Sequence, residues 1–281
     1  MQILCNIIDF FKREISHIYD LKECESLAYI VIDKIFGYNK SDFILRSNET
    51  INERQRKIII NIVKKLKKNV PIQYILEEAY FFDLNFFVNS SVLIPRPETE
   101  ELVRWIVNES KQKNSFLDIG TGSGCLIITL NKLLKGSFSA IDVCSNALDI
   151  AKINNRQHNT EVNFYEMDIL KKENIFKDKF DVILSNPPYV TISEKKFIKK
   201  NVIDNEPHIA LFVSDRDPLI FYRSIIKRSK DLLSKEGCLY FEINERFGLD
   251  IIQLLNNEGF VNIKLKKDIN GKDRMIKAVF K

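Results

Sequence analysis

The stretch FDVILSNPPYV, residues 180–190, constrains the fold more than any other part of the chain. Its first six residues are largely apolar and predict a short buried strand over 180–185. The strand must stop at Asn186-Pro187-Pro188-Tyr189, because neither proline has an N–H and each proline disfavours the helical region for the residue before it. The sequence therefore predicts a buried strand that ends in a stiff turn rich in hydrogen-bond acceptors.

This turn can present two acceptors to one small volume. The side-chain oxygen of Asn186 and the carbonyl of Pro187 can face the same space, with the aromatic face of Tyr189 beside them. Such a site suits a planar NH2 group, as in a carboxamide or an exocyclic base amine, whose nitrogen is to be methylated. The alternative is a turn without a chemical role, since Asn and Pro are ordinary turn residues.

A glycine-rich turn, Gly120-Thr121-Gly122-Ser123-Gly124, separates a predicted strand over 116–119 from an amphipathic helix over 125–134. Alternate glycines let the backbone bend sharply and let a ligand approach closely. The next predicted strand, 138–141, ends in Asp142, about where a carboxylate meets ribose hydroxyls in doubly wound folds. Turn and acid together predict a nucleoside cofactor, although Asp142 could instead cap the helix predicted over 146–157.

Two further candidates follow the strand predicted over 162–165. Asp168 is placed to reach an adenine amine, and Ile169 is placed to cover the adenine ring. The alternative for Asp168 is a loop carboxylate that faces water. Because ligands of such sheets bind outside the carboxyl ends of the strands, the positions of Gly120, Asp142, Asp168 and Asn186 predict one shared site.

The order of elements after residue 115 predicts an α/β fold. Strands alternate with helices, as a doubly wound, mostly parallel sheet requires, and the predicted sheet has seven strands. Further helices are expected over 221–233 and 249–256, and further strands over 239–243, 262–266 and 275–280. No helix separates the last two strands, so we expect them to pair antiparallel.

The chain upstream predicts a small helical bundle over 1–70, a β-hairpin linker over 71–94 and the α/β domain over 95–281. Helical spacing predicts one helix over 21–36 and a second that starts at Asn48 or Thr50. After the prolines at 95 and 97, Thr99 or a neighbour is expected to cap another helix. The bundle is interpreted as a substrate-docking module, with a covering scaffold as the alternative.

Composition excludes several classes of protein. The 281 residues are 45% hydrophobic and 29% charged, as in a globular protein, and no apolar run predicts a membrane span. Five scattered cysteines without a C-x-x-C and three histidines without metal spacing predict no metal and a reducing, cytoplasmic location. The net charge of +5 is too small to predict a nucleic-acid-binding surface.

The motifs together resemble the N5-glutamine methyltransferases that modify peptide chain release factors. The resemblance extends over essentially the whole chain and is most specific in PIQYIL (71–76), LIPRPETE (93–100), DIGTGSG (118–124), SNPPYV (185–190), EPHIAL (206–211) and GKDRMI (271–276). One departure is Glu77-Glu78, where relatives usually have a glycine. It leaves the shape of this turn open.

The resemblance implies S-adenosylmethionine as cofactor and, as partner, a release factor whose Gly-Gly-Gln loop supplies the glutamine. It implies that Asn186 contacts both cofactor and amide, that Pro187, Pro188 and Tyr189 complete the glutamine pocket, and that the cofactor is held by Gly120, Thr121, Gly122, Ser123, Gly124, Asp142, Asp168 and Ile169. Three alternatives stay open: a nucleic-acid base methyltransferase, a methyltransferase of a ribosomal-protein glutamine, and a non-catalytic binding protein with the same fold.

Overall fold

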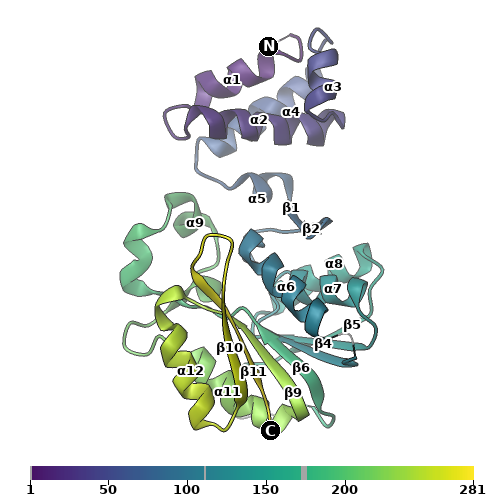
Figure 1. The fold of residues 1–281 in the computed structure, drawn as a ribbon. Coiled ribbons are helices and arrows are strands. Elements are labelled where there is room, and N and C mark those ends of the chain that lie inside the picture. Colours follow the sequence, from purple (N-terminus) through teal and green to yellow (C-terminus); the bar gives the residue numbers. More distant parts are fainter. Residues whose placement is uncertain (1, 111, 172–175) are drawn as a thin grey trace. The chain divides into compact units, whose positions relative to one another are not determined.

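The computed structural model describes residues 2–110, 112–171 and 176–281, which divide into two compact units (Figure 1). The smaller unit comprises Met1–Leu76 and Lys199–Asn205, and the larger comprises Glu77–Ile198 and Glu206–Lys281. Each unit is described by itself. Among the described residues, none of the helices is both long enough and apolar enough to cross a membrane.

The smaller unit is helical and has its own apolar core. Its helices are α1 (Asn6–Ile15), α2 (Leu21–Phe36), α3 (Lys40–Leu45), α4 (Glu53–Leu66), α5 (Ile72–Leu76) and α9 (Lys200–Asn205). Ile7, Phe11, Ile32 and Ile59 are fully buried among them. The predicted bounds of the 21–36 helix are confirmed: Asp20 caps its first turn, and Gly37 ends it with a φ of 70°.

The predicted start of the second helix at Asn48 or Thr50 is wrong. The helix α4 begins at Glu53 because Asn52 is its N-cap and accepts a hydrogen bond from the Gln55 backbone N–H at 2.9 Å. The Gln55 side-chain oxygen in turn accepts a hydrogen bond from the Asn52 backbone N–H, which completes a capping box.

The larger unit contains a seven-stranded sheet in the order β10-β11-β9-β6-β3-β4-β5. The strands are β3 (Ser115–Ile119), β4 (Ser137–Asp142), β5 (Val162–Glu166), β6 (Phe180–Ser185), β9 (Leu233–Glu242), β10 (Val261–Lys267) and β11 (Asp273–Val279). All neighbours pair parallel except β11, which pairs antiparallel with both β9 and β10. The predicted fold class and the antiparallel final pair are confirmed.

Helices cover the two faces of this sheet (Figure 1). On one face lie α6 (Pro97–Glu109) and α7 (Cys125–Leu133), with α8 (Ser145–Gln157) beside α7; on the other lie α11 (Ile220–Leu232) and α12 (Gly248–Asn257). The strands alternate between the two cores, since Leu239 and Phe241 pack toward α11 and Tyr240 packs toward α6. Shorter elements are β7 (Val190–Thr191), η1 (Ile192–Phe197), α10 (His208–Leu211), β8 (Phe212–Val213) and η2 (Glu245–Phe247).

Two predicted bounds in the larger unit need correction. The α6 N-cap is Arg96, with Pro97 as the first helical residue, so Thr99 lies inside the first turn and is not the cap. The strand β9 starts at Leu233 instead of residue 239, because α11 ends at Leu232 and the chain continues directly as a strand.

The β-hairpin that we predicted over residues 71–94 is shorter in the structure and spans only Glu78–Phe87. Residues Ile72–Leu76 form the helix α5, and only β1 (Glu78–Phe81) and β2 (Leu84–Phe87) pair. Its aromatic residues Phe81 and Phe86 are buried in the core beside α6 and α7, so the hairpin is part of the larger unit. At Glu77 the φ is 55°, a left-handed conformation that favours glycine, so this glutamate adopts the backbone of a glycine turn.

A buried asparagine on α8 fastens this hairpin. Asn154 is fully buried; its Oδ1 accepts from the Phe87 backbone N–H at 2.7 Å, and its Nδ2 donates to the carbonyls of Phe87 at 3.0 Å and Ser123 at 2.9 Å. One side chain therefore satisfies backbone groups of both β2 and the glycine-rich turn.

We predict that Asn154→Ala lowers the melting temperature of the protein by about 5 °C or more, because three buried backbone groups lose their partner at a cost of about 2 kcal/mol. Thermal unfolding followed by circular dichroism measures the change. The control is Asn146→Ala, which removes an exposed asparagine from the first turn of the same helix. Equal melting temperatures for the two variants would contradict the assigned role of Asn154.

Candidate active site

A cavity of about 360 Å³ lies at the carboxyl ends of β3, β4 and β6. The sheet reverses its direction of growth between β3 and β6, which is where ligands of doubly wound sheets bind. Most of the predicted site residues line this cavity: Gly120, Thr121, Gly122, Ser123, Asp142, Asp168, Ile169, Asn186, Pro187 and Pro188. Gly124 and Tyr189 do not.

The glycines of the turn have two different functions. Gly120 and Gly122 have φ values of 76° and 54°, and no atom lies within 4 Å of the position that a Cβ would take. A Cβ on Gly124 would instead meet Ile128 Cδ1 at 2.8 Å and Ala151 Cβ at 3.2 Å. Gly120 and Gly122 therefore keep the cavity open, whereas Gly124, expected to bind the cofactor, permits the close packing of α7 on α8.

The carboxylate of Asp142 holds the glycine turn from β4. One oxygen accepts from the Gly122 N–H and the other from the Cys144 N–H, each at 2.9 Å. Burial raises the pKa of Asp142, although these hydrogen bonds oppose the shift. The N-cap of α8 is Cys144, so the alternative of Asp142 as the cap of this helix is wrong. Asp142 remains on the cavity wall as a candidate ribose ligand.

The loop after β5 forms another part of the wall. Ile169 is buried and lines the cavity, and Asp168 is half-buried beside it. One Asp168 oxygen accepts from the Leu170 N–H at 2.9 Å, which fixes the loop. Asp168 is therefore part of the cavity wall and does not simply face bulk water.

A second buried carboxylate, Asp118 at the end of β3, was not predicted as a site residue. Its Oδ2 accepts from the Thr121 hydroxyl at 2.7 Å, and its Oδ1 has no partner within the described residues. Burial raises the pKa of Asp118 to about 7. The motif DIGTGSG contained the signal, because Asp118 lies two residues before Gly120, where the turn that lines the cavity begins.

The first residue of α7, Cys125, also lines the cavity. Burial raises the pKa of its thiol to about 12. The described residues include no group of three His, Cys, Asp or Glu side chains arranged to hold a metal ion.

The bend after β6 separates the large cavity from a smaller one of about 50 Å³. Asn186 and Pro187 line both, and Tyr189 and Glu242 line only the smaller. The Tyr189 hydroxyl donates to Glu242 Oε1 at 3.0 Å, and burial beside this carboxylate raises the pKa of Tyr189. The Tyr189 ring therefore does not face the large cavity; it lines only the smaller one.

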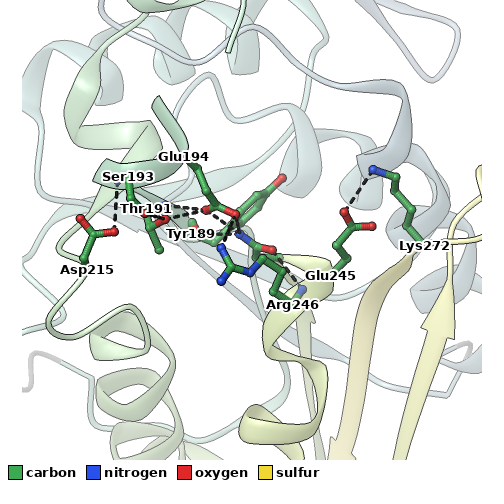
Figure 2. Close-up of polar contacts among 9 residues, drawn as sticks. Tyr189, Thr191, Ser193, Glu194, Asp215, Glu245, Arg246 and Lys272 are labelled. Carbon is green, nitrogen blue, oxygen red and sulfur yellow. Dashed lines mark hydrogen bonds and ion pairs between the residues drawn. The ribbon is translucent and has the colours of Figure 1, made fainter. Parts of the chain in front are cut away.

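The segment that follows β9 contacts the next part of the chain, residues 189–194 (Figure 2). Asn244 Nδ2 donates to the Tyr189 carbonyl at 3.2 Å and to Glu194 Oε2 at 3.1 Å. The same Glu194 accepts from the Thr191 N–H at 2.9 Å and forms an ion pair with Arg246 at 3.2 Å. These contacts hold the bend from its C-terminal side, and they were not predicted from the sequence.

An ion pair connects two of the sequence motifs near the cavity. Arg96 Nη2 lies 2.7 Å from Glu206 Oε1, and Glu206 Oε2 accepts from the Ile94 N–H at 3.2 Å. Glu206 is buried, and Arg96 lines both cavities. The pair holds LIPRPETE against the start of EPHIAL and keeps one guanidinium at the cavity wall.

The residues present fit S-adenosylmethionine. The space above Gly120 and Gly122 accommodates a close approach of ligand to backbone, and Ile169 supplies an apolar surface for a ring. Asp142 offers carboxylate oxygens at the cavity wall.

Known proteins resemble both parts of the chain. The methyltransferase small domain family matches residues 98–209, and the PrmC N-terminal domain family matches residues 20–76. A release factor glutamine methyltransferase of Flavobacterium psychrophilum is 45% identical over 96% of this chain and 97% of its own length. One of Bacteroides thetaiotaomicron is 40% identical over 97% of this chain and 98% of its own length.

Among solved structures, a methyltransferase from Pyrococcus furiosus matches with a TM-score of 0.52 and 16% identity, over 81% of this chain and 98% of that one. This likeness concerns the fold.

The raised pKa of Asp118 predicts how stability depends on pH. The folded state holds this proton more tightly than the unfolded chain, whose carboxyl has a pKa near 4, so stability falls as the pH rises toward and through 7. Between about pH 5.5 and 8 the loss is about 2 kcal/mol, or about 5 °C in melting temperature. We expect Asp118→Asn to remove this loss.

Melting temperatures of the ligand-free protein across this pH range test the prediction. The control is Asp149→Asn, at an exposed aspartate of α8. If wild type and Asp118→Asn lose stability in parallel as the pH rises, the buried carboxyl is not the cause.

Proposed function

Since this chain belongs to the release factor glutamine methyltransferases, we propose that it methylates the side-chain amide nitrogen of the glutamine in the Gly-Gly-Gln loop of a peptide chain release factor. The observation that supports this most directly is the position of Asn186 and Pro187 in the walls of both cavities. One cavity is large enough for the cofactor, and the adjoining one has the size of a small side-chain tip.

The cofactor is S-adenosylmethionine, which supplies an electrophilic methyl group on a sulfonium. We assign Gly120, Thr121, Gly122 and Ser123 to the methionine end and the ribose, Asp142 to the ribose hydroxyls, and Asp168 and Ile169 to the adenine. The first group lies on the turn that has room for a ligand, and the others lie along the same wall. Gly124 is assigned to packing.

The catalytic task of the chain is to hold and aim the amide. Asn186 Oδ1 and the Pro187 carbonyl accept the two amide hydrogens, which fixes the plane of the NH2 group and increases electron density on its nitrogen. Pro188 keeps this bend rigid, and Tyr189 closes the smaller cavity through its bond to Glu242. The largely apolar cavity favours the loss of charge that accompanies transfer.

Methyl transfer to the amide nitrogen also releases a proton. The amide nitrogen would form a bond to the methyl carbon as the bond between this carbon and the sulfonium sulfur breaks, its electron pair leaving with the sulfur as a neutral thioether. The nitrogen then loses one hydrogen as a proton. Asn186 and Pro187 offer only neutral oxygens, which are too weakly basic to keep this proton, so it passes to water.

The smaller unit is proposed to dock the release factor. Its separate core and its match to a domain family of its own support a module with a separate task. Exposed apolar side chains on it, Ile44 and Leu45 at the end of α3, suit a protein partner better than a nucleic acid. Such a substrate is a component of translation, which places the reaction in the cytoplasm.

We predict that Gly122→Ala weakens S-adenosylmethionine binding at least tenfold, because the new methyl group enters the space left for the ligand. Isothermal titration calorimetry measures the affinity. The control is Gly259→Ala, at another glycine with positive φ and open space around it, away from the cavity. Both variants carry the strain of a left-handed alanine, so similar affinities would contradict the role of Gly122.

The reaction is tested by mass spectrometry of the Gly-Gly-Gln peptide from an intact release factor treated with the protein and cofactor. We expect a gain of one methyl group on the glutamine, and no gain when this glutamine is replaced. Asn186→Ala should lower kcat/KM by about thirtyfold or more, equivalent to about 2 kcal/mol of lost transition-state stabilisation. Asn146→Ala serves as the control.

Parallel reactions test RNA and a ribosomal protein as alternative substrates. Methyl transfer to RNA or to a ribosomal protein, without transfer to the factor, would refute the proposed substrate, and cofactor binding without any transfer would indicate a binding protein. Docking by the smaller unit predicts a higher kcat/KM for the intact factor than for the isolated loop peptide.

A further inference from the structure

Glu242, the last residue of β9, is a buried carboxylate beside the catalytic bend to which no role has yet been assigned. It is 1% exposed and accepts two hydroxyl hydrogen bonds: from Thr99 Oγ1 to Oε2 at 2.6 Å, and from the Tyr189 hydroxyl to Oε1 at 3.0 Å. It thus connects the first turn of α6 with the bend after β6.

The bond from Thr99 determines what this hydroxyl can do next. A threonine hydroxyl has one hydrogen, and Thr99 gives it to Glu242, so Thr99 Oγ1 can only accept from its other neighbour. That neighbour is Asn186, whose Nδ2 lies 3.4 Å from Thr99 Oγ1, a long hydrogen bond. The amide of Asn186 must therefore turn its NH2 toward Thr99 and its oxygen away from it.

The orientation matters because an asparagine amide has nearly the same shape when flipped. The proposed reaction needs the oxygen of Asn186 to face the NH2 of the substrate. If the NH2 of Asn186 faced the substrate instead, it would meet the NH2 of the glutamine. Two hydrogen-bond donors cannot bond to each other, so Asn186 could not hold the glutamine. Something must distinguish the two orientations, and the donor order from Thr99 to Glu242 does so.

We propose that Glu242 is a positioning residue, which acts through Thr99 to keep the side-chain oxygen of Asn186 directed at the substrate amide. This inference rests on the proposed function. Burial raises the pKa of Glu242, but the hydroxyl bonds from Thr99 and Tyr189 and the positive charge of Arg274 oppose this shift and favour the charged form. A charged carboxylate can only accept, so Glu242 sets the direction of the whole hydrogen-bond sequence. An amide at position 242 has no such restriction, since its NH2 could donate to Thr99 and reverse the order.

The test compares isosteric variants by steady-state kinetics on an intact release factor. Thr99→Val removes the hydroxyl and keeps the shape, and Thr99→Ser keeps the hydroxyl. We expect kcat to fall roughly 10- to 100-fold in Thr99→Val and Glu242→Gln, with S-adenosylmethionine affinity within about twofold of wild type, and to stay within about threefold in Thr99→Ser. A merely structural role would not separate Ser from Val in kcat while leaving cofactor affinity unchanged.

The double variant Thr99→Val/Glu242→Gln tests whether Glu242 acts through Thr99. We expect Glu242→Gln to add less than about threefold in the Thr99→Val background, because the connection is already broken. Full additivity would overturn the inference, as would wild-type kcat in folded Thr99→Val. If Glu242→Gln does not fold, the two Thr99 variants decide alone. An inactive wild type would instead refute the proposed function.

Discussion

The meeting of β3 and β6 at the point where the sheet reverses its growth is the constraint on which the site depends. Helices leave the two strands toward opposite faces, and the ends of the strands open into one cavity. The glycine turn after β3 and the proline-rich bend after β6 thus lie side by side although more than sixty residues separate them along the chain. In the proposed reaction, the first strand end would receive the cofactor and the second would hold the group to be methylated.

Around this junction, the third neighbouring strand has a supporting function. Glu242, the last residue of β9, accepts from the Tyr189 hydroxyl, and Asn244, two residues further along the chain, donates to the Tyr189 carbonyl. The last residue of β9 and the segment just after it therefore contact both the side chain and the backbone of Tyr189. Proline restricts the backbone of the bend, and these side chains restrict its remaining freedom. Rigid placement of a neutral amide is what a reaction without a strong base requires.

The sequence was sufficient to predict features that depend on neighbours along the chain. Apolar runs followed by Gly120-Thr121-Gly122 or by Asn186-Pro187 indicated strands, their ends and the fold class, because backbone restrictions of glycine and proline act locally. Contacts between distant segments were not predictable in this way. Nothing near Thr99 indicates Glu242, which lies 143 residues later. The packing of Gly124 against α8 and the hydrogen bond from Tyr189 to Glu242 were likewise not predicted, because these partners come from other elements.

Cys125 in the cavity wall would lie close to the methyl donor and could itself be methylated. A thiolate is a stronger nucleophile than a carboxamide and would compete for an alkylating carbon. With its pKa raised to about 12, Cys125 is almost entirely in the uncharged thiol form at neutral pH. The surroundings of Cys125 thus protect the protein from alkylating itself at this position.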